Sequence, residues 1–178
     1  RACWFSMEAL PNHLRGMLDV CDSITLTSLH VAEELHADGN ASDARSWSPY
    51  LAMLPDETFY RTFHPSYLSH EGYTLNDRVD WWKRWDNALE TCYQEYLKRP
   101  VSLPLTYRLV KLAHTLHLTR RYGDGMIPQI DMTNGVAYED RTVEPFPCER
   151  DSSGKMISFG YRAARDIATG EEFLTDYT

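Results

Sequence analysis

The predicted fold depends on one stretch, M-I-P-Q-I-D-M-T-N-G, which spans residues 126–135. It is an apolar run that ends abruptly in Asp131, Thr133, Asn134 and Gly135. An apolar run of this length can bury a short strand, and the polar residues after it must then satisfy their own backbone or hold a ligand. Two interpretations stay open for this stretch alone. One is an Asx-type turn after a strand, and the other is a buried Asn that reads the polar edge of a ligand.

A second stretch, at residues 157–177, reads I-S-F-G-Y-R-A-A-R-D-I-A-T-G-E-E-F-L-T-D-Y. Its pattern predicts a strand, a turn at Ala168-Thr169-Gly170, and a second strand that ends in Tyr177. Glu171, Glu172 and Asp176 make this end of the chain acidic. Such a group favours a basic partner, and it is equally typical of a solvated turn and strand end.

Together, these two stretches resemble the SET-domain methyltransferases. Residues 127–135 resemble the family segment that has an apolar run, an Asp and then Asn-His, and residues 161–178 resemble its closing segment, with Arg-Asp-Ile, Gly-Glu-Glu and a final Tyr. A third stretch, S-W-S-P-Y-L at 46–51 followed by Leu54-Pro55, is similar to the inserted helical region of the Rubisco large-subunit methyltransferase subgroup. The three matches occur in the family's order.

The resemblance implies an α+β fold. We expect small SET-like sheets around 126–138 and 156–177, with a large helical region inserted at about 23–121. The chain would then be a single SET-like domain over 1–178, with 122–178 as the C-terminal half of the SET core. Because the chain starts at Arg1 without an initiator Met, we expect a processed or truncated piece.

The resemblance also assigns roles to four residues. Tyr177 corresponds to the family's closing Tyr beside the methyl-transfer channel, and is the expected catalytic residue. Asn134, Gly135 and Asp131 correspond to the segment that contacts S-adenosylmethionine. We therefore expect residues 134 and 177 to come together, with the segments that start at 126 and 157 side by side. No metal is implied.

Departures from the family pattern keep a second function open. The family's His after the Asn is Gly135 here, and Gly supplies backbone groups without a ring. The only Gly-x-Gly, Gly123-Asp124-Gly125, lies too late in the chain to match the family's cofactor turn, and the subgroup's C-terminal substrate-binding domain is not in this sequence. One hypothesis is a protein-lysine N-methyltransferase. The other is a catalytically inactive SET-like domain that serves as a structural or binding subunit, because a fold does not dictate a function. Chance matches in an unrelated helical scaffold are a third interpretation.

The helical region is predicted from apolar spacing. Residues 23–37, 75–97 and 105–121 each repeat apolar side chains at steps of three and four, and Ser23 or Thr27 is the expected cap of the first helix. His114 and His117 are three residues apart and could touch one metal, but without a motif such as His-Glu-x-x-His they favour simple packing. The segment with Pro145 and Pro147 is predicted to be a loop.

Composition narrows the partners and the setting. The net charge of −8 argues against generic nucleic-acid binding and suits a protein or peptide substrate, or a larger protein assembly. No apolar run reaches the roughly 20 residues of a membrane span. The four cysteines, Cys3, Cys21, Cys92 and Cys148, are widely spaced. This spacing supports neither a zinc site nor a disulfide framework, so we expect a reducing intracellular setting, without distinguishing plastid, cytoplasm or nucleus.

Overall fold

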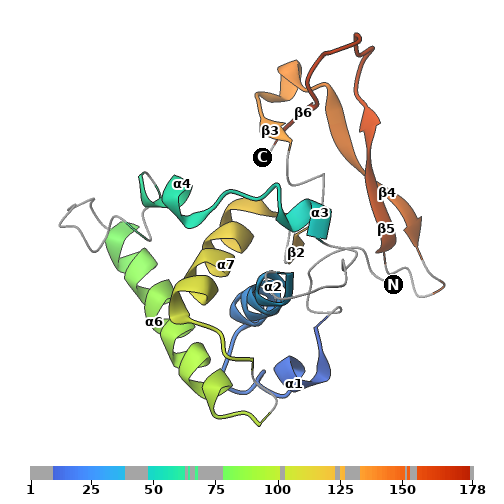
Figure 1. The fold of residues 1–178 in the computed structure, drawn as a ribbon. Coiled ribbons are helices and arrows are strands. Elements are labelled where there is room, and N and C mark those ends of the chain that lie inside the picture. Colours follow the sequence, from blue (N-terminus) through green and yellow to red (C-terminus); the bar gives the residue numbers. More distant parts are fainter. Residues whose placement is uncertain are drawn as a thin grey trace. The chain divides into compact units, whose positions relative to one another are not determined.

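The computed structural model describes residues 10–38, 48–62, 64, 67, 78–100, 103–122, 125–126, 133–150, 152 and 156–176. These residues form two compact units, one from Leu10 to Met126 and one from Thr133 to Asp176. Helices build the first and short strands the second (Figure 1). The expected mixture of helices and small sheets is therefore present. No helix among the described residues is long and apolar enough to cross a membrane.

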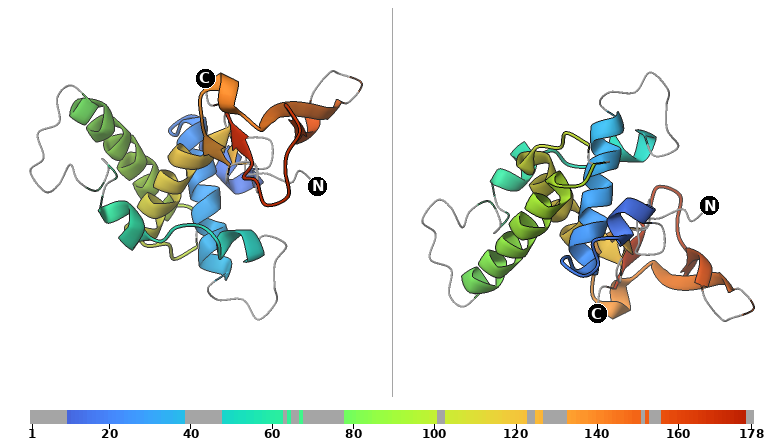
Figure 2. Two further views of the ribbon diagram at one scale, coloured as in Figure 1. Left: turned by 90° about the horizontal axis from the view of Figure 1, so that it is seen from above. Right: turned by 90° about the horizontal axis from the view of Figure 1, so that it is seen from below.

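The helical unit is centred on α2 (Ser23–Asp38), α6 (Arg78–Leu97) and α7 (Tyr107–Arg120), with α7 packed against both of the others (Figures 1 and 2). Among the described residues of this unit, shorter helices accompany them: α1 (Asn12–Arg15), α3 (Ser48–Leu51) and α4 (Glu57–Arg61). A short antiparallel pair, β1 (Arg121–Tyr122) with β2 (Gly125–Met126), follows α7. The core side chains include Leu14, Met17, Leu26, Leu29, Val31, Leu89, Tyr96, Val110, Leu116 and Met126.

The helix starts use caps that apolar spacing alone does not reveal. The carboxylate of Asp22 accepts from the backbone N of Thr25 at 2.7 Å, and Asp22 rather than Ser23 or Thr27 is therefore the cap of α2. Thr27 instead donates its hydroxyl to the carbonyl of Ser23 at 2.9 Å inside the helix. At the start of α7, the Thr106 side chain accepts from the backbone N of Leu109. Short polar side chains at these positions satisfy N–H groups that the first turn leaves unpaired.

A buried carboxylate joins three parts of the helical unit. Glu33 on α2 is 6% exposed, and it accepts from Nε2 of His13 and from the Tyr96 hydroxyl, each at 2.8 Å. The same hydroxyl accepts from the backbone N of Leu103 at 2.7 Å. Burial raises the pKa of Tyr96, which therefore remains a neutral donor at physiological pH. The acidic side chain of Glu33 is therefore buried together with hydrogen-bond partners, as a polar group in a core must be.

Cys21 and Cys92 form a disulfide, which the wide spacing of the cysteines did not predict and which is at odds with the expected reducing setting. Cys21 lies just before α2 and Cys92 lies on α6, with their Cα atoms 5.4 Å apart. The two are 71 residues apart in sequence, so their pairing depends on how α2 and α6 pack and leaves no local sequence signal. The wide spacing of the cysteines therefore no longer supports a reducing setting.

The strand unit contains two separate pairs among its described residues. β4 (Val143–Arg150) and β5 (Met156–Ala163) form an antiparallel hairpin. β3 (Asn134–Gly135) pairs in parallel with β6 (Leu174–Thr175). A short 3-10 turn, η2 (Tyr138–Asp140), lies between β3 and β4.

The strand β4 corrects the predicted loop with Pro145 and Pro147. In the antiparallel register Pro145 lies opposite Tyr161 and Pro147 opposite Phe159. Residues two apart direct their backbone groups to the same edge of a strand, so both missing N–H groups can lie on the edge away from β5. In agreement, the backbone N of Ala164 donates to the carbonyl of Thr142 at 2.9 Å, which places the hydrogen-bonded pairs of the regular part of β4 at Glu144 and Phe146.

Candidate functional site

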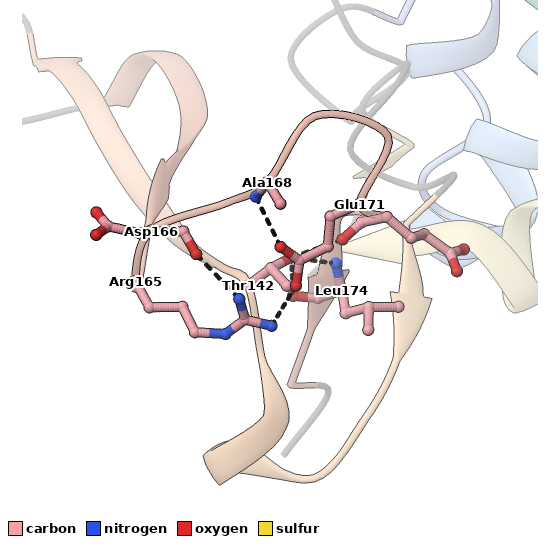
Figure 3. A network of polar contacts seen from close by, with 7 residues as sticks. Thr142, Arg165, Asp166, Ala168, Glu171 and Leu174 are labelled. Carbon is pink, nitrogen blue, oxygen red and sulfur yellow. Dashed lines mark hydrogen bonds and ion pairs between the residues drawn. The ribbon is translucent and has the colours of Figure 1, made fainter.

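Thr142 fixes the path of the closing segment in the strand unit. Its side chain is fully buried, and its hydroxyl donates to the carbonyl of Glu172 at 3.0 Å and accepts from the backbone N of Leu174 at 2.7 Å. Its backbone N donates to the carbonyl of Leu174 at 3.0 Å, and its carbonyl accepts from Ala164. We call Thr142, Ala164, Glu172 and Leu174 the Thr142 network (shown in part in Figure 3). It joins the start of β4, the end of β5 and the residues around β6.

The turn between β5 and β6 is held by one ion pair and one tight backbone turn. The guanidinium of Arg165 lies between the carboxylate of Glu171 and the carbonyl of Asp166 (Figure 3). The other oxygen of that carboxylate accepts from the backbone N of Ala168 at 2.8 Å. The hydrogen bond from Arg165 is the main reason that the pKa of Glu171 lies below its usual value. Gly170 has φ of 85°, a conformation that only Gly adopts without strain.

The parallel pair of β3 and β6 brings the two predicted site segments together. Asn134 lies opposite Leu174 and Gly135 opposite Thr175. The backbone N of Val136 continues the ladder by donating to the carbonyl of Thr175 at 3.0 Å. The prediction that the segments starting at 126 and 157 lie side by side is confirmed for these residues. Asp131 and Tyr177 lie outside the described residues, so the predicted meeting of Asn134 with Tyr177 stays a prediction.

Asn134 and Gly135 are both exposed at the end of this strand pair. The side-chain amide of Asn134 donates to the carboxylate of Glu172. An amide has two N–H donors and one acceptor oxygen, so this bond leaves further capacity on the same side chain. Glu171 and Glu172 of the predicted acidic end have partners within the strand unit: Glu172 with Asn134, and Glu171 with Arg165.

Two tyrosines that the sequence analysis did not single out lie in the same unit. The hydroxyl of Tyr161 on β5 is 3.0 Å from the hydroxyl of Thr133, the residue just before Asn134. Tyr138 is exposed, and the guanidinium of Arg141 lies 3.5 Å from the centre of its ring. The only local signal for Tyr161 was its place in a predicted strand, and strand alternation does not identify a hydroxyl partner 28 residues away.

No protein family, curated protein or solved structure matches the chain.

The histidines considered as metal ligands form a buried polar contact between α2 and α7. Nδ1 of His114 and Nδ1 of His117 lie 3.0 and 3.1 Å from the hydroxyl of Ser28, which also donates to the carbonyl of Ile24. Burial is the main reason that the pKa of His114 falls to about 3, so its ring is neutral. No group of three or more His, Cys, Asp or Glu side chains that could hold a metal occurs in the part of the chain that the structure describes.

Proposed function

We propose that this chain carries the methyl-transfer part of a SET-type protein-lysine N-methyltransferase that uses S-adenosylmethionine. One observation supports this proposal above the others: β3 pairs with β6, so Asn134 and Gly135 lie beside Leu174 and Thr175. These are the two segments that resemble the family's cofactor segment and its closing segment. The parallel pair connects residues 40 apart in the chain, so no local turn accounts for it.

The side chains at the strand pair have chemistry that suits the donor molecule. S-adenosylmethionine carries an ammonium group, a sulfonium and ribose hydroxyls, all of which favour oxygen acceptors. The amide oxygen of Asn134 and the carboxylate of Glu172 are such acceptors, and the amide N–H of Asn134 already donates to that carboxylate. Gly135 has no side chain, so a ligand can approach its backbone closely. These three residues would hold the donor.

In the proposed reaction, S-adenosylmethionine supplies an activated methyl group. The protein must align a lysine amine with that group, exclude water and keep the amine neutral. A lysine with an ordinary pKa near 10.4 is mostly charged at neutral pH, so it has to lose its proton before it attacks. By its resemblance to the closing Tyr, Tyr177 would hydrogen-bond the amine and offer an aromatic face to the cation.

The alternative function is a catalytically inactive SET-like subunit of a larger assembly. It is favoured by the bond between Asn134 and Glu172, because a cofactor that needs both N–H donors of the amide would have to displace the carboxylate. It is also favoured by Gly135, which stands where the family has His. In this case the Thr142 network would maintain the fold, and no donor would bind at β3.

Calorimetry with S-adenosylmethionine separates the two functions. The titration uses the full-length protein that contains this chain, as the wild type and as Asn134→Ala. Asn87→Ala is the matched control, because Asn87 is also an exposed Asn but lies on α6 in the helical unit. Saturable binding that is lost in Asn134→Ala and kept in Asn87→Ala supports the enzyme. Absence of binding at millimolar donor supports the inactive subunit.

A further inference from the structure

Thr133 and Tyr161 connect β3 to the hairpin through their side chains. Their hydroxyl oxygens are 3.0 Å apart, and either group can be the donor. Thr133 is 9% exposed, and Tyr161 is half-buried. A hydroxyl pair that is largely removed from water is fixed more firmly than an exposed pair, because water competes less for its donors and acceptors.

Thr133 and Asn134 face opposite ways. Thr133 lies at a bend just before β3 and is buried, whereas Asn134, the first residue of β3, is exposed. Because one planar peptide unit joins the two residues, a contact that holds Thr133 inward also restricts the directions in which Asn134 can point. The contact of Thr133 therefore helps to set the position of the Asn134 side-chain amide.

The backbone ladder alone is a weak anchor for β3. β3 has two residues with register partners on β6 among the described residues, and one further backbone bond, from Val136 to Thr175, extends the ladder. A pair of strands this short is marginal in water without further packing. A side-chain bond to a third strand, β5, is therefore a substantial part of what fixes β3 among the described residues.

We infer that the Thr133–Tyr161 pair is the positioning element of the donor site, because it holds β3 in the orientation that presents Asn134 to the ligand. This inference rests on the proposed function. Neither residue touches the donor, and both act through Asn134. When the pair is lost, β3 spends less time in the competent orientation, and the apparent affinity for the donor falls with the competent fraction.

Three variants test the pair. Tyr161→Phe and Thr133→Val each remove one hydroxyl with little change in volume, and the double variant completes the cycle. Tyr93→Phe is the matched control, because it removes a buried Tyr hydroxyl that donates to the carbonyl of Leu105 in the helical unit. Donor affinity is measured by calorimetry, and opening of β3 is measured by hydrogen exchange at the Val136 amide, which donates to Thr175.

We expect exchange at Val136 to rise by about three- to tenfold in each single variant, and donor affinity to fall by about twofold or more. The double variant should be no worse than either single variant, because both remove the same bond. Tyr93→Phe should change neither quantity. If the wild type binds the donor and both Tyr161→Phe and Thr133→Val bind it with unchanged affinity, the positioning role is overturned and the proposed function stands. Wild type that binds no donor overturns the proposed function, and the positioning role with it.

Discussion

Replacing Thr142 with Val is the most direct test of how the closing segment is held. The substitution keeps the shape and burial of the side chain but removes the hydroxyl, which accepts from Leu174 at 2.7 Å and donates to the carbonyl of Glu172 at 3.0 Å. Without this hydroxyl, the half-buried N–H of Leu174 loses an acceptor, which costs about 1–3 kcal/mol. Glu172 is exposed, so water can replace the bond to its carbonyl at little cost.

We therefore expect Thr142→Val to make the opening of β6 easier by about 2 kcal/mol, or roughly thirtyfold in the opening equilibrium. Hydrogen exchange at the Leu174 and Val136 amides measures this opening without the assumption that both units unfold together. Thr142→Ser is the control, because it keeps the hydroxyl and loses only a methyl group, at a cost of about 1 kcal/mol or less. If both variants open equally, or if Thr142→Val opens no more easily than wild type, the hydroxyl does not hold β6.

Three further predictions concern single features of the two units. Replacing Cys21 and Cys92 together with Ala should lower the free energy of unfolding of the helical unit by about 4 kcal/mol, because the bond closes a loop of 71 residues. Urea unfolding followed by circular dichroism measures this free energy. Mass spectrometry that finds free thiols at both positions in the wild type would contradict the pairing. Because the pKa of His114 is 6.5 when unfolded and about 3 when folded, the unfolded chain takes up the proton first as the pH falls below 6.5. Stability is therefore complete above that pH and should fall by about 2 kcal/mol by pH 5, and His114→Gln should flatten this decline in unfolding curves. Gly170→Ala should destabilise its turn by about 1–2 kcal/mol, because Gly170 has φ of 85° and a Cβ there meets no atom within 4 Å, so the cost is that of the backbone alone. Gly16→Ala is the control and should cost nothing, because φ of Gly16 is −67°. Hydrogen exchange measures both, and an equal change in exchange for the two substitutions, each in its own turn, would refute the argument.

The sequence predicted the regular elements better than their partners. The helix predicted at 23–37 is α2 (Ser23–Asp38), because its apolar spacing matches one buried face. The same spacing places Glu33 on α2 but does not identify His13 and Tyr96 as the groups that make its burial possible. Such partners come from other helices, and their choice depends on packing that no local pattern records.

The candidate site shows the same division. Resemblance correctly placed Asn134 beside the closing segment, since β3 pairs with β6. It gave no indication that Thr142 would hold that segment. The local rule that Pro interrupts strands predicted a loop at Pro145 and Pro147. Both residues lie in β4 instead, because a two-stranded hairpin has an outer edge where a missing N–H is harmless.

The topology of the strand unit implies an order of assembly. The hairpin joins residues that are close in sequence, such as Arg150 and Met156, whereas the β3–β6 pair joins residues 40 apart and encloses the whole hairpin. Contacts of short sequence separation form faster, because less chain entropy is lost before they are made. During synthesis the hairpin can therefore fold while β3 still has no strand beside it, and Asn134 acquires its neighbours only when residue 175 has left the ribosome.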